Sequence, residues 1–167
     1  MKPLINGMLL IALAAFAPAF LRAAENQTPQ RPNDVHVYRS EKELKWGPAP
    51  SVVPKGAEAA VLDGHPFGEG GAAYTLRLKM PDGYKIPPHW HPTDENVTIL
   101  SGRLGMGMGD KMDRAGGQLI KAGGFVRMPK TVHHYAWTMG PTTIQVQGNA
   151  PFVFNYVNPA DDPRNQR

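Results

Sequence analysis

The feature that most constrains the fold is a period-two alternation of apolar and polar residues, repeated in short pieces along the chain. In the clearest piece, Tyr74, Leu76, Leu78 and Met80 alternate with small or charged residues. Successive side chains of a strand point to opposite faces, so this pattern predicts a strand with one buried face. The pieces are separated by turn residues, in a chain with 18 glycines and 17 prolines. Short strands with frequent turns predict an antiparallel sandwich or barrel.

The N-terminus predicts a cleavable signal peptide, residues 1–23. Lys2 gives a short positive region, and Met8 to Leu21 is apolar, at about 14 residues too short for the roughly 20 of a spanning helix. Small residues place the cleavage site near Ala19 or Ala23. We therefore expect a periplasmic or secreted protein that has no membrane contact after cleavage.

The remaining chain is long enough for one domain with its own core. We expect a flexible leader over 24–33, a β-barrel over 34–163 and a polar tail over 164–167, with the whole C-terminal end loose. The chain has no cysteine, so neither a disulfide nor a cysteine-linked lipid anchor can form. The net charge is only +4, without a basic run that contains aromatic residues, which argues against a nucleic-acid partner.

The stretch PPHWHPTDENVTILSG, residues 87–102, carries a possible metal site. On a strand His89 and His91 project from the same face about 7 Å apart, and Trp90 points the other way. A bend at the following proline would return Glu95 to the same ion. Imidazole and carboxylate ligands suit Fe, Mn, Zn, Ni or Cu and do not select among them.

A fourth ligand could come from the histidine pair in MPKTVHHYAW. His133 and His134 are adjacent, so on a strand they face opposite ways and only one would share the site. His36 and His65 have no neighbouring ligands in the sequence, and we expect ordinary surface or loop histidines there.

These residues resemble the cupin superfamily, in particular its small, single-domain exported bacterial members. The first cupin motif is met at every spacing, by Gly83, His89, His91, Glu95 and Gly102. The second motif is matched by Gly123, Pro129 and His134. In that motif Thr131 stands in place of a glycine, and Thr138 stands where asparagine is frequent.

The resemblance implies an all-β, double-sheet jelly-roll barrel that holds one divalent transition metal through His89, His91, Glu95 and His134. It also implies that His133 faces outward or lies behind the ligands. Cupins commonly pair, so a homodimer is a further expectation. Pocket walls would come from inward strand residues, and parity lets only about half of the candidates point inward. The candidates are Tyr74, Leu76, Met106, Met108, Phe125, Arg127, Tyr135, Trp137, Gln145, Gln147, Phe152 and Phe154; we select Tyr74, Met106, Phe125, Arg127, Gln145 and Phe154.

Two functions fit these residues. The first is a metal-dependent enzyme of the oxygenase, isomerase or decarboxylase type, acting on a small oxygen-bearing molecule. Glu95 would then be a fixed ligand or a general base, and Arg127 could bind a substrate carboxylate if it points inward. The alternative is a non-catalytic periplasmic protein that binds or senses a metal or small ligand. A fold alone does not separate the two.

Overall fold

In a computed structural model of the chain, residues 37 and 39–166 are described, so the predicted signal peptide and leader lie outside the described residues. Almost all regular structure is β. Among the described residues no helix is long and apolar enough to cross a bilayer. The elements are η1 (Glu41–Glu43), β1 (Gly47–Pro48), β2 (Glu58–Asp63), β3 (Ala73–Met80), β4 (Lys85–Trp90), β5 (Glu95–Ser101), β6 (Arg103–Met108), β7 (Gln118–Lys121), β8 (Phe125–Met128), β9 (His134–Thr138), β10 (Thr142–Asn149), β11 (Asn155–Tyr156), η2 (Pro159–Asp161) and η3 (Pro163–Asn165).

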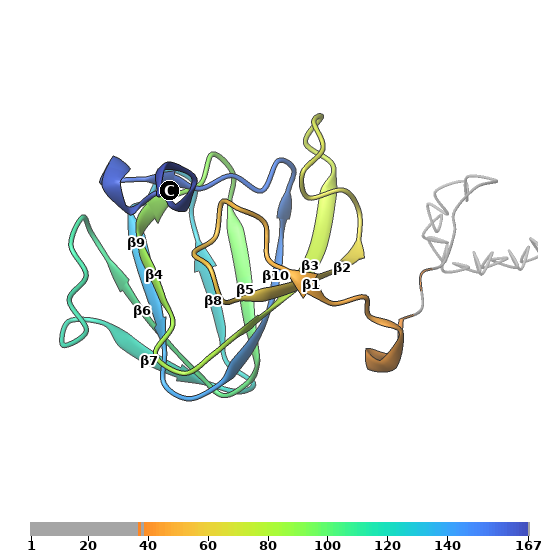
Figure 1. The fold of residues 1–167 in the computed structure, drawn as a ribbon, viewed down its shortest axis with the longest axis horizontal. Coiled ribbons are helices and arrows are strands. Elements are labelled where there is room, and N and C mark those ends of the chain that lie inside the picture. Colours follow the sequence, from red (N-terminus) through yellow and green to blue (C-terminus); the bar gives the residue numbers. More distant parts are fainter. Residues whose placement is uncertain (1–36, 38, 167) are drawn as a thin grey trace, which may run out of the picture. The chain divides into compact units, whose positions relative to one another are not determined.

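The strands form two antiparallel sheets that face each other (Figure 1). The first sheet, sheet A, has the order β1-β2-β3-β10-β5-β8, and the second, sheet B, has the order β11-β4-β9-β6-β7. Strands that are far apart in sequence therefore lie side by side, such as β3 with β10 and β4 with β9. This is the all-β, double-sheet jelly roll that the resemblance implies.

The core fills the space between the two sheets, and strand parity decides which residues enter it. In β3, Tyr74, Leu76, Leu78 and Met80 are all buried, and the residues between them are not. Register pairing places the buried residues of β10 and β5 on the same face. The alternation that predicted strands therefore also identified the core side of sheet A.

Two aromatic residues that we considered for the pocket wall lie instead on the outer side of sheet B. His134, Ala136 and Thr138 take the inward positions of β9, which leaves Tyr135 and Trp137 pointing outward. Both are nevertheless buried, because they pack over two glycines of β6, Gly105 and Gly107, where a Cβ would overlap the rings. The alternating glycines of β6 therefore make room for aromatic rings outside the core.

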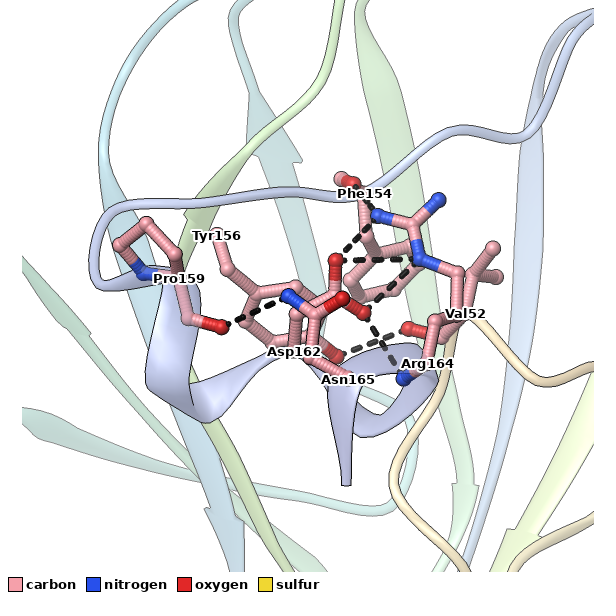
Figure 2. Close-up of polar contacts among 7 residues, drawn as sticks. All are labelled: Val52, Phe154, Tyr156, Pro159, Asp162, Arg164 and Asn165. Atoms are coloured by element: carbon pink, nitrogen blue, oxygen red, sulfur yellow. Dashed lines mark hydrogen bonds and ion pairs between the residues drawn. The ribbon is translucent and has the colours of Figure 1, made fainter. Parts of the chain in front are cut away.

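The C-terminal end, which we expected to be loose, is ordered by polar contacts (Figure 2). The Asn158 and Asp162 side chains cap the two 3-10 turns η2 and η3. Asp162 also pairs with the Arg164 guanidinium at 2.6 Å. The Tyr156 hydroxyl donates to the Val52 carbonyl at 2.8 Å, which links this end to the N-terminal part of the domain.

Candidate metal centre

Three buried histidines converge between the sheets. One ring nitrogen of each of His89, His91 and His134 lies within 4.8 Å of the other two. His89 and His134 are direct register partners on β4 and β9, and His91 follows the last residue of β4. Of the adjacent pair, His134 therefore belongs to the histidine cluster and His133 does not.

An irregularity in β4 aims His89 inward. Ile86 and His89 are three positions apart, an odd number, yet both line the interior cavity. The register with β9 shifts between them, at the Pro87–Pro88 pair. Such an extra residue turns the following side chain to the other face, which is how bulges re-aim side chains next to functional sites. The two prolines have no amide hydrogen, so the irregularity leaves no backbone donor at these positions without a partner.

Backbone carbonyls fix the orientation of all three imidazole rings. Nδ1 lies 2.7 Å from the Pro87 carbonyl oxygen in His89, 2.6 Å from that of Val153 in His91 and 3.0 Å from that of Val132 in His134. A carbonyl oxygen can only accept, so each Nδ1 carries the hydrogen and each Nε2 of a neutral ring presents a lone pair. Metal-binding histidines usually have this arrangement.

Glu95 approaches the same point from sheet A, at the first residue of β5. Its Oε2 lies 3.5 Å from His91 Nε2 and 3.9 Å from His134 Nε2. These gaps are long for hydrogen bonds. Ligands that share one ion at metal–ligand distances near 2.1 Å lie about 3.0–3.4 Å apart, so only small inward movements separate the atoms from a coordinating geometry.

Two of the imidazole nitrogens have no partner in the described structure. Nε2 of His91 and Nε2 of His134 are fully buried and make no hydrogen bond. An unpaired buried polar atom costs about 1–3 kcal/mol, so such atoms call for an explanation. Three convergent imidazole nitrogens and one carboxylate match the ligand preferences of a divalent transition metal. The residues therefore fit the ion that the fold implies.

Comparison with solved structures identifies the fold. No protein-family model and no curated protein matches the sequence. Among similar solved structures, the polyketide cyclase RemF from Streptomyces resistomycificus has a TM-score of 0.60 at 17% identity, over 77% of this chain and 90% of that one. An RmlC-like cupin from Shewanella frigidimarina has a TM-score of 0.53 at 12% identity, over 69% of this chain and 91% of the other. The chain has the cupin fold. KdgF from Halomonas sp. is also similar, with a TM-score of 0.52 at 15% identity, over 66% and 91% of the two chains.

The environment of the site shifts the pKa values of its histidines in different directions. Burial, aided by the nearby His134 and His91 rings, holds the pKa of His89 well below 6.5. Burial also lowers the pKa of His134, against the opposing pull of Glu95. In His91 burial acts the same way, but Glu95 outweighs it and raises the pKa.

Burial and the neighbouring charges act on the pKa of Glu95 with the opposite sign to their action on the pKa of His91. Burial pushes the pKa of Glu95 upward, but the facing His91, followed by His134, produces a net lowering. Glu95 is therefore an anion between the sheets, with only 7% of its surface exposed. A buried carboxylate needs positive partners, and an ion held beside the histidines would supply one.

The interior cavity beside the histidines is small and apolar. It measures about 20 Å³, enough for roughly one water molecule. Among the six selected pocket residues, Met106 and Phe154 line it, and the Phe154 ring stacks on the His89 ring at 4.4 Å. Tyr74 is buried in the core but does not line the cavity. Burial, and then the Glu95 charge, raise the pKa of its hydroxyl.

The other three selected residues lie outside the core and do not line the interior cavity, where the inward-pointing prediction placed them. On β8, Val126 pairs with Val97 and Met128 pairs with Glu95, so these take the inward positions and Phe125 and Arg127 face outward. Phe125 is 60% exposed. Arg127 is held at 2.6 Å by Asp94 rather than by the site. Gln145 lies on the outer face of sheet A, where it accepts a hydrogen bond from Arg77.

A larger groove lies between the edge strands of the two sheets. It measures about 530 Å³ and lies between β6 and β7 on one side and β8 on the other. Met106 lines both this groove and the interior cavity, so the two spaces share this lining residue. Phe125 and Arg127 contribute to the groove, although not to the cavity. Its apolar lining residues are Met106, Met108, Ile120, Phe125, Val126 and Met128.

One contact of the site was not predicted from the sequence, that of the Val153 carbonyl, which orients His91. Phe152 and Phe154, both considered for the pocket wall, pack on the histidine rings, although residues 151–154 form no strand. Their apolar alternation was the available signal for this segment. His133 makes a 2.6 Å contact with Asp110 and lies half-exposed outside the site.

Proposed function

We propose that the chain is an exported, mononuclear metal-binding cupin that acts as a metal-dependent enzyme on a small oxygen-bearing molecule. The observation that carries the proposal is the convergence of three imidazole Nε2 atoms, each set by a carbonyl behind it and two of them without a partner. Export rests on the predicted signal peptide alone. The homodimer stays a prediction.

His89, His91 and His134 would hold the ion, with Glu95 as the fourth ligand. A divalent ion held by this set would supply Lewis-acid polarisation of a substrate oxygen, and Fe, Mn or Cu would add redox chemistry. The protein's own contribution is an apolar surrounding with room for about one water molecule. Leu78, Ile86 and Phe154 are among its walls, and they limit the access of water to the polar atoms.

Glu95 is the residue suited to move a proton at this site. Its pKa is lowered, so it is ionised at neutral pH, and its Oε2 lies beside the point where the imidazole nitrogens meet. A carboxylate that leaves the ligand set can accept a proton from a bound substrate. Both roles of Glu95, ligand and base, are compatible with its position.

The two cavities indicate how a substrate would be accommodated. The interior space admits only a few atoms, whereas the groove has the volume of ordinary ligand pockets, about 300–1,000 Å³. We propose that the apolar body of the substrate lies in the groove and its oxygen-bearing end reaches past Met106. RemF is named as a polyketide cyclase, which supports an enzymatic role for a chain of this fold without assigning that reaction here.

A non-catalytic metal-binding or sensing protein is the alternative, and the interior cavity favours it. A space of about 20 Å³ leaves little room for a substrate beside the ion unless Met106 moves. In that case the histidines would serve only to bind the metal, and the groove would have no connection to it.

The test compares two adjacent histidines. His134→Ala removes a proposed ligand, whereas His133→Ala removes an exposed neighbour and serves as the matched control. We expect one equivalent of transition metal in the unaltered protein and in His133→Ala, and at least tenfold weaker binding in His134→Ala, measured by elemental analysis and titration. The same three proteins, loaded with Fe, Mn, Ni, Cu or Zn, are then assayed on small diketones, phenols and carboxylates.

The outcomes separate the two functions. Equal metal content in the two variants would remove the site as assigned. Stoichiometric metal without turnover on any substrate would favour the binding protein over the enzyme.

A further inference from the structure

The C-terminal part of the chain supplies direct contacts to two of the proposed ligands. We call residues 152–156 the histidine-facing segment. Its Val153 carbonyl accepts the hydrogen of His91 Nδ1 at 2.6 Å, and its Phe154 ring stacks on His89 with 18° between the planes. The direction of the His91 ring therefore depends on where this segment lies.

Few backbone bonds hold the histidine-facing segment in place. Its first residues belong to no strand, and β11, which follows, is two residues long and pairs with β4 at Trp90 and His89. The Phe152 amide donates to the Pro66 carbonyl at 2.6 Å. The Phe154 carbonyl accepts from a side chain instead, the Nη2 of Arg164, at 3.2 Å.

Arg164 is itself fixed by Asp162. The Asp162 carboxylate accepts from Nε of Arg164 at 2.8 Å and from its Nη2 at 2.6 Å, and it also accepts from the backbone amide of Arg164 (Figure 2). A guanidinium held by two parallel bonds has a defined direction. Nη2 is thereby aimed at the Phe154 carbonyl, one residue from the carbonyl that orients His91.

We propose that Arg164, held by Asp162, is a positioning residue of the metal centre, which sets the His91 imidazole through the backbone of Phe154 and Val153. The inference rests on the proposed metal site. It concerns His91 and His89 and not His134, whose Nδ1 is oriented by Val132.

The test replaces Arg164 and compares the result with the same replacement of a second arginine, Arg103. Arg164→Met keeps much of the side-chain length and removes both the donor and the charge. Arg103→Met is the control, since the Arg103 guanidinium likewise donates to a backbone carbonyl, here from Nε to that of Met139 at 3.2 Å, and this carbonyl orients none of the histidines. Each protein is titrated with Co²⁺, its Co²⁺ visible spectrum is recorded, and thermal unfolding of the metal-free form is measured.

Loss of a group behind a metal ligand weakens metal binding about 10- to 100-fold, and Arg164 acts one carbonyl further away. We therefore expect Arg164→Met to weaken Co²⁺ binding about tenfold and to alter the visible spectrum, with Arg103→Met unchanged in both. Arg164→Lys retains a donor for Phe154 and should recover part of the affinity and the original spectrum. If metal-free Arg164→Met is unfolded, Asp162→Asn replaces it, with a smaller change in the same direction.

Three results would count against the proposal, and each leads to a different conclusion. Unchanged affinity and spectrum in Arg164→Met would overturn the positioning role and leave the metal site standing. An equal loss in Arg103→Met would show a general effect of stability and would also overturn it. Failure of the unaltered protein to bind Co²⁺ would remove the proposed metal site and this inference with it.

Discussion

The three histidines are chemically identical side chains with similar burial, yet they differ in their readiness to lose a proton. His89 and His134 have lowered pKa values, so they are neutral at pH 7 and ready to act as ligands. His91 has a raised pKa because Glu95 Oε2 lies closest to it, at 3.5 Å. Imidazole must be neutral to coordinate, so metal binding would have to displace any proton that the nearby Glu95 charge stabilises on His91.

Replacement of Glu95 should change the number of protons released when the metal binds. In Glu95→Gln the charge that raises the pKa of His91 is gone, and burial alone keeps this ring neutral. We expect proton release per bound Co²⁺ at pH 7 to fall in Glu95→Gln, together with weaker binding. Calorimetry in buffers of different ionisation enthalpy measures this number.

Asp94→Asn is the control for that experiment. Asp94 is the adjacent carboxylate, but it pairs with Arg127 and the Lys130 amide outside the site. Its replacement should leave proton release unchanged. The same release in Glu95→Gln as in the unaltered protein would mean that Glu95 does not control the protonation of His91.

At the scale of elements, the turn before β9 keeps a conformation that suits glycine. Thr131 has φ of 65°, and it is the only non-glycine residue with positive φ among the described residues. Its amide donates to the His91 carbonyl at 2.8 Å, so the turn contacts the chain next to the site. The other departure from the cupin motif, Thr138, uses its hydroxyl to accept from the Tyr84 amide and to donate to Pro81.

Thr131→Gly should stabilise the protein. A β-branched residue in the left-handed region costs about 1–2 kcal/mol, and the greater freedom of glycine in the unfolded chain offsets about 0.5–1 kcal/mol of the gain. We expect the free energy of unfolding to rise by roughly 0.5–1 kcal/mol, measured by urea denaturation.

Thr93→Gly is a matched change at a nearby turn. Thr93 also donates from its hydroxyl to a backbone carbonyl, that of Asn149, but it has no positive φ. This variant should lose stability. A loss of stability in Thr131→Gly as well would show that the left-handed threonine is not strained.

Sequence reasoning identified the strands and the converging histidines because both depend on local spacing. Alternation gives the buried face of β3, and the separation of His89 and His91 gives two side chains on one side. It failed on three of the residues selected for the wall of the interior cavity. The outward position of Gln145 follows from the buried Ile144 and Val146 beside it, so parity could have excluded this residue.

The remaining misses had no local signal. Phe125 and Arg127 face outward because β8 pairs with β5 in a register that places Val126 and Met128 inside. A single sequence contains no information on that register. The contact of Arg164 with the Phe154 carbonyl likewise depends on the path of the chain after β11, where composition alone suggested a loose end.

At the scale of the whole molecule, the opposite pKa shifts predict a stability maximum for the metal-free protein. Below the unfolded histidine pKa near 6.5, unfolding takes up protons on His89 and His134, so stability falls as the pH falls. Above 6.5, unfolding releases the proton that native His91 retains, so stability falls as the pH rises through its raised pKa. Urea midpoints from pH 5 to 8.5 in chelator should therefore peak near pH 6.5.

Glu95→Gln separates the two sides of this maximum. The decline above pH 6.5 depends on the raised pKa of His91, so it should disappear in this variant, and the decline below pH 6.5 should persist. A urea midpoint that is constant across the whole range would contradict the assignment.

Glu95 begins the strand whose inward residues are Val97 and Ile99, so the carboxylate and the core of sheet A occupy one face of β5. A one-residue insertion between His91 and Glu95 that shifted β5 would turn this whole face outward and expose the core. The position of the Glu95 carboxylate and the burial of the β5 core residues therefore depend on the same register of the strand. Lineages of this chain should be able to lose the proposed metal site by substitution of one of its residues, whereas a change in the number of residues between His91 and Glu95 would also disrupt the domain.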